Sequence, residues 1–260
     1  MLLRRQFVHL FGRGSLGVAL LGTAACRSTD DIGNPTPTGS TAPTTSSDRT
    51  PTTSASSTTS APAAAERTWE RVDLVFVSAY VVVRAGEAAL IDTGTEGSAD
   101  EIEGALSALG AGWAGVSDVI LTHSHGDHVG SLEAVLAEAG SATPRAGEPD
   151  IAAIRSSRPI NAVAEGDVVF GLEVIATPGH TPGHISLFDP DLRILFAGDA
   201  LNGGDGVVLG PNPRFTPDMD TAMTSVGKLA GFDYDLIVFG HGDPVGDRPV
   251  DQVADLPPGG

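Results

Sequence analysis

The sequence predicts an α/β sandwich in which two mixed β-sheets pack face to face and helices cover their outer faces. Runs rich in Val, Leu and Ile alternate with amphipathic stretches of helical spacing from about residue 68 to residue 255. Their order (strands, helix, strand, helix, strands, helix, strand) suits such a sandwich. All histidines after His9 fall in three short turn-like segments, where catalytic groups commonly lie.

The first half of this region is expected to form one sheet with helices against it. Ile102 and Leu106 share one face of a helix predicted over residues 98–109, and Gly110 follows as a stop signal. A second helix is predicted over residues 129–139. The strands predicted in this half lie at residues 71–77, 80–84, 88–91 and 119–121.

The second half is expected to supply the other sheet. Gly171 marks a hairpin turn, and Asp-Pro-Asp at residues 189–191 marks another. A third helix is predicted over residues 217–229. The strands predicted in this half lie at residues 168–170, 172–175, 185–188, 194–196 and 236–239.

Residues 1–26 are predicted to be an export signal. Arg4 and Arg5 precede an apolar run that is too short to span a bilayer of about 30 Å as a helix and that ends before Cys26. The alternative, a buried N-terminal helix, is disfavoured because Ser/Thr-rich sequence follows at once. The arginine pair resembles a twin-arginine signal, the export route for folded proteins. The segment from Thr23 to Cys26 resembles a lipoprotein box, in which the cysteine becomes lipidated.

Residues 27–66 are predicted to be a disordered linker, because 19 of these 40 positions are Ser or Thr and apolar residues are few. A flexible chain of this length reaches tens of ångströms. Residues 67–260 then form a single domain. The predicted location is extracytoplasmic, at the cell surface or in the periplasm, anchored by a lipid on Cys26 or alternatively secreted.

Charge and cysteine content narrow the chemistry. The formal net charge of −18 argues against nucleic acid or anionic lipid as a partner. The charge says little about the substrate, which is expected to be a small molecule. Cys26 is the only cysteine, and the mature domain therefore has neither a disulfide nor a thiolate ligand. Histidine and carboxylate must do the chemistry. Nothing in the sequence indicates the oligomeric state.

The densest cluster of such residues is the segment Thr-His-Ser-His-Gly-Asp-His at residues 122–128. If this segment begins extended, His123 and His125 project to the same side and can hold one metal ion. Asp127 and His128, one turn further on, can face a second ion. Imidazole and carboxylate suit zinc above all, and also iron or manganese.

His-x-His-x-Asp-His after a strand resembles the signature of the metallo-β-lactamase superfamily. The segments that resemble the rest of its pattern are Asp92-Thr93-Gly94, residues 177–184, residues 196–199 and residues 239–242. The resemblance implies the αββα fold of that superfamily and two divalent metal ions. It assigns His123, His125 and His180 to the first ion, Asp127, His128 and His241 to the second, and Asp199 to both.

The same resemblance implies roles for residues beside the metals. Asp92 is expected to support metal ligands from behind. His184 is not a ligand in the family, which leaves a structural or a pocket-lining role open.

The implied reaction is hydrolysis of an ester, thioester or lactone-like bond. A water between two cations has a pKa lowered towards neutrality and can attack as hydroxide, with Asp127 as a proton shuttle.

Several alternatives remain open from the sequence. The fold also hosts mononuclear non-haem iron oxidoreductases and β-lactamase-type amide hydrolases, although β-lactamases lack the bridging aspartate seen here as Asp199. A tyrosine placed as in lactonases is not found, because only Tyr80 and Tyr234 exist. A surface lipoprotein that binds metal without catalysis is a further alternative.

Two loops near the predicted site also have two interpretations. Residues 202–206 are expected to form a flexible loop near the site rather than a phosphate loop. Arg214 lies either near an anionic substrate or within a rigid connection to the next helix.

Overall fold

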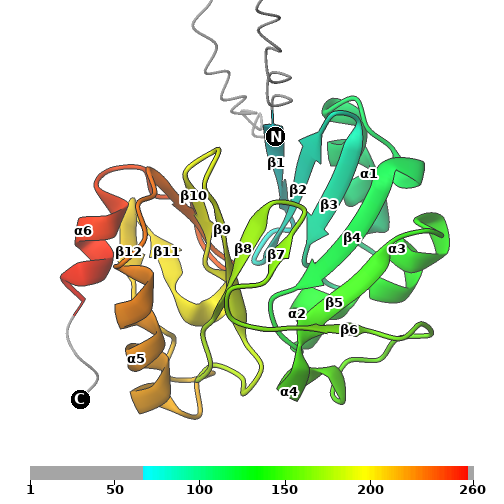
Figure 1. Ribbon diagram of the computed structural model, residues 1–260. Helices are drawn as coiled ribbons and strands as arrows, with labels where there is room; N and C mark the ends of the chain where they lie inside the picture. The colour runs from blue at the N-terminus through cyan, green and yellow to red at the C-terminus, as the bar shows by residue number, and fades with distance from the viewer. Residues whose placement is uncertain (1–66, 257–260) are drawn as a thin grey trace, which may run out of the picture. The chain divides into compact units, whose positions relative to one another are not determined.

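Strand β2 (Ser78–Arg84) shows how the sequence builds layers. Successive side chains of a strand point to opposite faces, and both faces of β2 are buried. Val81 packs in one apolar cluster with helix α1 (Ala99–Ala108), whereas Val82 packs in another cluster with the second sheet. The computed structural model, which describes residues 67–256, accordingly has the predicted order of helices, sheet, sheet and helices (Figure 1).

The first sheet has six strands in the order β1-β2-β3-β4-β5-β6. Its first three strands are antiparallel, and β3 to β6 run parallel. Its other strands are β1 (Arg67–Asp73), β3 (Glu87–Ile91), β4 (Val116–Leu121), β5 (Thr143–Gly147) and β6 (Asn161–Val163). Beside it lie α1, η1 (Trp113–Gly115), α2 (Gly126–Val129), α3 (Leu132–Glu138) and α4 (Glu148–Ile151).

The second sheet has five strands in the order β13-β10-β9-β8-β7, and β11 and β12 form a separate hairpin. Its strands are β7 (Val168–Val169), β8 (Leu172–Ala176), β9 (Ile185–Asp189), β10 (Ile194–Phe196) and β13 (Leu236–Val238). The hairpin consists of β11 (Asn202–Gly204) and β12 (Val207–Leu209). The remaining helices are η2 (Gly198–Ala200), α5 (Met219–Leu229) and α6 (Pro249–Ala254).

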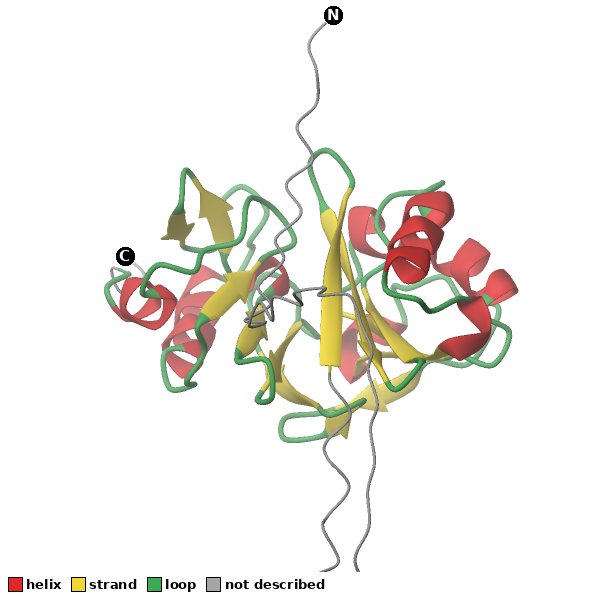
Figure 2. Cartoon of the chain, turned by 90° about the horizontal axis from the view of Figure 1, so that it is seen from above, coloured by secondary structure: helices red, strands yellow, loops and turns green. Residues whose placement is uncertain are grey.

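Three apolar clusters hold the layers together. One lies between the sheets, one joins the first sheet to α1 and α3, and one joins the second sheet to α5 and α6. Figure 2, seen from above, shows the helices on the two outer sides with the strands between them. The predicted fold class is therefore confirmed.

The structure corrects two sequence predictions near the site. The first strand was expected at residues 71–77, but β1 ends at Asp73, and the next four residues turn back into β2 with Val75 92% and Phe76 60% exposed. The helix expected over residues 129–139 is broken into α2 and α3. The two helices do not join because the backbone N–H of Gly130 donates to the carbonyl of Gly94, 2.8 Å away, and the backbone of Ser131 (φ −97°, ψ 8°) departs from helical values.

Strands β5, β6, β11 and β12 were not predicted. They are short, and β5 contains proline and glycine, so tertiary pairing rather than local propensity places them in sheets. The predicted signal (residues 1–26) and linker (residues 27–66) lie outside the described residues. Among the described residues, no helix is long and apolar enough to cross a membrane.

Candidate metal centre

All seven residues predicted to bind metal lie together where strands of the two sheets end. The loop after β4 carries His123 and His125, and α2 carries Asp127 and His128. The loop after β8 carries His180, the one after β10 carries Asp199, and the one after β13 carries His241. The two sheets are joined here, because the backbone N–H of Ile185 at the start of β9 donates to the carbonyl of Thr122, 2.8 Å away. The groups able to hold an ion are His123/His125/His180, Asp127/His128/His241 and His123/His128/Asp199.

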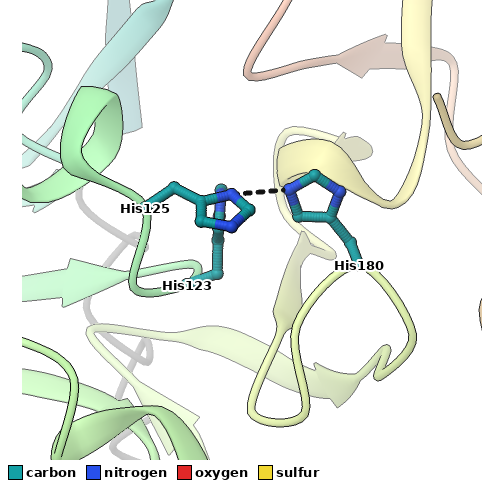
Figure 3. A group of neighbouring side chains, drawn as sticks. All are labelled: His123, His125 and His180. Carbon is teal, nitrogen blue, oxygen red and sulfur yellow. Dashed lines mark hydrogen bonds between the residues drawn. The ribbon is translucent and has the colours of Figure 1, made fainter. Parts of the chain in front are cut away.

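His123, His125 and His180 form the first group (Figure 3). His125 is extended (φ −68°, ψ 145°), as the predicted same-side projection of the two histidines requires. Its Nδ1 lies 3.0 Å from His123 Nε2 and 2.9 Å from His180 Nε2. Burial lowers the pKa of His180 to about 4, and burial also lowers that of His123. Both rings are therefore neutral at physiological pH, the form that binds a metal ion.

Asp127, His128 and His241 form the second group. His241 Nε2 lies 3.3 Å from Asp127 Oδ2, and His128 Nε2 lies 3.9 Å from the same oxygen. Hydrogen bonds to Asp127 and Asp199 raise the pKa of His241 to about 10. Burial opposes protonation of His128, but the charges of Asp199 and Asp92 outweigh it and raise its pKa.

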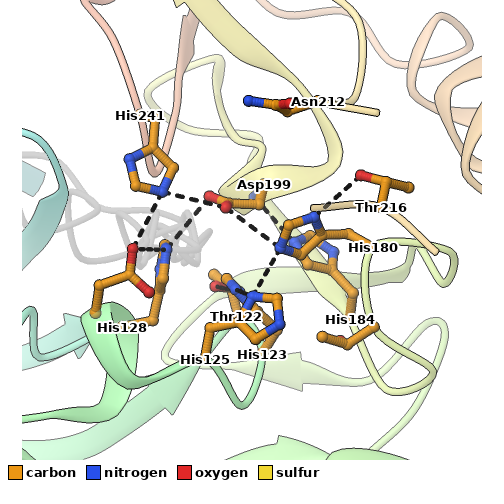
Figure 4. A network of polar contacts seen from close by, with 12 residues as sticks. Thr122, His123, His125, His128, His180, His184, Asp199, Asn212, Thr216 and His241 are labelled. Carbon is orange, nitrogen blue, oxygen red and sulfur yellow. Dashed lines mark hydrogen bonds and ion pairs between the residues drawn. The ribbon is translucent and has the colours of Figure 1, made fainter. Parts of the chain in front are cut away.

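Asp199 lies between the two groups (Figure 4). Its Oδ2 is 3.4 Å from His180 Nε2 and 3.2 Å from His241 Nε2, and its Oδ1 is 3.3 Å from His128 Nε2. Burial alone would raise the pKa of this carboxyl, but His128 and His241 lower it, so it is ionised. Although Asp199 Oδ1 and His128 Nε2 are buried, neither has a hydrogen-bond partner among the described residues. Two such orphaned atoms facing each other fit a bound cation.

Four of the five candidate ligand histidines form a hydrogen bond through Nδ1 with a residue outside the metal groups. This contact leaves Nε2 facing the other candidate ligands. The partners are Thr122 Oγ1 for His123, Asp92 Oδ2 for His128, Thr216 Oγ1 for His180 and the carbonyl of Phe76 for His241, at 3.0, 2.8, 3.2 and 2.6 Å respectively. Such partners fix the tautomer and the orientation of a ligand.

The sequence did not point to Thr216 or Phe76 as partners. Both lie outside the motifs, and only the fold brings them to the site.

Asp92 performs the supporting role that the resemblance implied. Its Oδ2 accepts hydrogen bonds from Thr122 Oγ1 and His128 Nδ1, both at 2.8 Å, and its Oδ1 accepts one from the backbone N–H of Thr122, 2.7 Å away. The backbone of Asp92 has φ +60°, which is unfavourable for a residue other than glycine. Three hydrogen bonds therefore hold Asp92 against His128 directly and against Thr122, the residue whose hydroxyl contacts His123.

His184 is structural. It is only 1% exposed, and burial lowers its pKa to about 3, so it is neutral. Nδ1 lies 2.8 Å from Thr177 Oγ1, and Nε2 accepts the backbone N–H of Asp199, 3.0 Å away. Both ring nitrogens are thus used inside the protein. The pocket-lining alternative is excluded.

Close packing at the last loop explains a glycine and a tyrosine. A Cβ on Gly240 would overlap Asp199 Oδ1 and His128 Cε1, so only glycine allows this approach. Tyr80 donates a hydrogen bond to the carbonyl of Phe239, 2.6 Å away, and burial raises the pKa of its hydroxyl. Tyr80 therefore positions the loop and is not free to act on a substrate.

Two segments with alternative interpretations are described by the structure. Residues 202–206, expected as a flexible loop, belong to the β11–β12 hairpin, whose turn has positive φ at Asp205 and Gly206 as a tight Asp-Gly turn requires. The backbone N–H of Gly203 donates to the carbonyl of His241, so this hairpin lies beside the site. Arg214 is exposed and lies over the ring of Phe215, and both interpretations of this residue stay predictions.

The sequence profile of the Metallo-beta-lactamase superfamily matches residues 72–241 of the chain's 260. The chain belongs to the metallo-β-lactamase superfamily. Homologues are named metallo-hydrolase and hydroxyacylglutathione hydrolase, and the chain is a hydrolase of this superfamily. Members bind divalent metal ions, typically two, and the clustered His and Asp side chains agree with that property.

Relatives of the superfamily domain are found in several organisms. The chain is 35% identical to the probable metallo-hydrolase YflN of Bacillus subtilis over 200 residues, covering 60% of this chain and 75% of the relative. It is 37% identical to a hydroxyacylglutathione hydrolase of Brucella anthropi over 147 residues, covering 54% of this chain and 52% of the relative. The match therefore spans about half the length of that enzyme.

Solved structures show the same fold. A metallo-β-lactamase family protein of Thermus thermophilus superposes with a TM-score of 0.58 at 23% identity, covering 73% of this chain and 77% of that protein. TTHA1623, solved in a di-iron-bound form, superposes with a TM-score of 0.57 at 25% identity, covering 70% and 94%. The β-lactamase SMB-1, at 22% identity and a TM-score of 0.53, covering 66% and 76%, shows the fold alone.

Proposed function

We propose that this superfamily hydrolase uses two divalent metal ions, zinc above all or else iron or manganese, to cleave an ester, thioester or lactone-like bond. The observation that carries the proposal is the pair of orphaned buried atoms, His128 Nε2 and Asp199 Oδ1, at the meeting point of the two groups. The relatives named hydroxyacylglutathione hydrolases support an acyl substrate.

Two of the three groups in the structure support the assignment of residues to two ions. His123, His125 and His180 would hold the first ion, and Asp127, His128 and His241 the second, with Asp199 shared. When bound, the two ions would lower the pKa of a water so that hydroxide is available as the nucleophile, and would polarise the scissile carbonyl. The partners at Nδ1 orient these rings so that Nε2 of each faces the ions.

Asp127 is the carboxylate best placed to move a proton. Its side chain is 30% exposed, whereas those of Asp92 and Asp199 are 3% and 8% exposed. A hydrogen bond from His241 lowers the pKa of Asp127, so this carboxylate is ionised and its partly exposed oxygens are available to a proton from the solvent side of the site.

A substrate panel tests the proposed chemistry. The full chain, loaded separately with zinc, manganese and iron, is assayed on lactones, thioesters, β-lactams and phosphodiesters. Hydrolysis of a lactone or thioester above the other classes is expected. Asp127→Ala should reduce the rate by about 10²- to 10⁴-fold, the usual contribution of general acid–base catalysis. Unchanged activity in that variant with full metal content would favour a metal-binding protein without catalysis.

A mononuclear non-haem iron oxidoreductase is the second candidate, and TTHA1623 in its di-iron-bound form shows that a protein of this fold can hold iron. Metal analysis of the protein as purified decides between them. Two ions per chain with hydrolysis supports our proposal. One iron per chain with oxygen consumption contradicts it.

We further propose that the protein is exported and anchored by a lipid on Cys26. The support is the sequence pattern of residues 1–26 alone. Fractionation of producing cells should find the wild type with membranes outside the cytoplasm and Cys26→Ser in the soluble extracytoplasmic fraction. Retention of both proteins in the cytoplasm would contradict the export signal.

A further inference from the structure

Asp150 lies outside every motif that the sequence singles out, yet its carboxylate joins two loops of the metal centre. The residue is only 2% exposed. Its Oδ2 accepts hydrogen bonds from the backbone N–H of Ser124 at 2.8 Å and from Thr181 Oγ1 at 2.7 Å. Its Oδ1 accepts the backbone N–H of Gly183, 2.7 Å away.

The positions of these donors matter. Ser124 separates His123 from His125, and Thr181 directly follows His180. One carboxylate thus connects the loop after β4 to the loop after β8, the two loops that carry the first group of candidate ligands. Apart from the imidazole rings of the candidate ligands, no other described side chain forms hydrogen bonds with both loops.

The surrounding backbone leaves Asp150 no room to shift. A Cβ on Gly183 would lie 2.5 Å from the backbone nitrogen of Asp150 and 2.8 Å from its Oδ1. A Cβ on Gly147 would overlap the carbonyl oxygen of Gly183. Two glycines therefore allow the short helix α4 to approach the loop after β8, and the carboxylate fills the space between them.

Charge gives a second reason for a carboxylate here. Asp150 has no Arg, Lys or His partner among the described residues, so three hydrogen-bond donors compensate its buried charge. The first group consists of imidazoles alone, two of which burial keeps neutral. A buried negative charge behind these loops would stabilise a divalent cation among the rings.

We propose that Asp150 is a positioning residue that sets the spacing of His123, His125 and His180 and thereby the affinity of the first metal ion. This inference rests on the proposed metal-dependent function. An asparagine at this position has one acceptor oxygen for three donors, so at least one donor must lose its partner. Outer partners of metal ligands commonly change affinity by about 10- to 100-fold.

The test measures zinc affinity by competition with a chromophoric chelator in the full chain and in Asp150→Asn. The wild type should bind two ions. Asp150→Asn should bind one of them about 10- to 100-fold more weakly and the other unchanged. Cobalt substitution identifies the site, because the visible absorption of the ion held by three histidines should be altered selectively.

Asp118→Asn is the matched control. Asp118 is 8% exposed, lies in β4, and accepts hydrogen bonds from Arg145 and Ser117 away from the metal loops. This variant should bind both ions as the wild type does. Thr181→Val removes a single hydrogen-bond donor to Asp150 and should weaken binding of the same ion by a smaller factor. If Asp150→Asn fails to fold, this variant tests the inference in its place.

Three outcomes are distinguishable. Wild-type affinity for both ions in Asp150→Asn, or in Thr181→Val where only that variant folds, would overturn the inference about Asp150. Equal weakening in Asp118→Asn and Asp150→Asn would overturn it as well, because the effect would then be general destabilisation. A wild-type chain that binds no zinc, manganese or iron would overturn the proposed function itself.

Discussion

The backbone N–H of Asp199 donates a hydrogen bond to His184 Nε2, 3.0 Å away, so a histidine outside the metal groups fixes the aspartate between them. The other nitrogen of His184 continues this contact to Thr177 Oγ1 at 2.8 Å. Thr177 lies 3.0 Å from Ser186 Oγ, which donates to the carbonyl of Ala197 at 2.9 Å. The chain of hydrogen bonds begins and ends on the loop that carries Asp199.

His184→Phe should destabilise the metal-free protein. The change leaves the N–H of Asp199 buried without a partner, which costs about 1–3 kcal/mol, and removes one of the two partners of the Thr177 hydroxyl, which keeps Ser186. Urea unfolding followed by circular dichroism measures the loss. Tyr234→Phe is the control, because the buried hydroxyl of Tyr234 has no hydrogen-bond partner among residues 67–256. Equal stability of His184→Phe and wild type would refute the role.

Gly240→Ala should abolish metal binding while leaving a folded domain of reduced stability. The added methyl group would overlap Asp199 Oδ1 and His128 Cε1 and separate two candidate ligands. Metal content after gel filtration and the Tm measure both effects. Gly104→Ala, in α1 with open space around it, should instead raise stability by about 0.5–1 kcal/mol. A Gly240→Ala protein that retains two ions would contradict the packing argument.

Asp92→Asn should weaken metal binding through His128. The amide can donate to His128 Nδ1, which would place the proton on Nε2, the nitrogen that faces Asp199. The loss of affinity expected for such an outer partner is about 10- to 100-fold. Chelator competition measures it, and the affected ion should be the one bound by the second group. Selective loss of the first ion would show that the tautomer is not the cause.

Metal uptake should release protons from the second group and not from His123 or His180. The pKa of His241 is raised to about 10, so this ring carries a proton at pH 8 that a metal ion must displace, whereas His180, with a pKa of about 4, carries none. Affinity for the second ion should therefore rise with pH up to about 10. Calorimetry in buffers of different ionisation enthalpy measures the release. Uptake of two ions without protons would contradict the raised pKa.

The sequence predicted the fold correctly, and the structure brings together the seven residues that local spacing and the family resemblance singled out. His123 and His125 project to one side because the segment is extended, and this follows from spacing alone. The predicted hairpin at Gly171 depends only on its local turn signal, and the structure confirms it.

The contacts that the sequence could not predict all join distant segments. Asp150 contacts Ser124 and Gly183, 26 and 33 residues away, and no local signal marks an aspartate after a proline as a support for a metal site. β1 was misplaced for a similar reason. Its polar residues form a strand because β2 pairs with them, while the more apolar segment that follows turns towards His241.

The hydrogen bond between His241 Nδ1 and the carbonyl of Phe76 spans 165 residues. It requires the first hairpin of the domain and the loop after its last strand to be in place together. A nascent chain that has not yet been synthesised as far as His241 lacks this contact. A chain that is cleaved between Phe76 and His241 also lacks it once the two fragments separate. If the second ion binds as proposed, its retention would report that these two distant segments are both in place, and a metal-sensitive dye would serve as a quality test for each preparation.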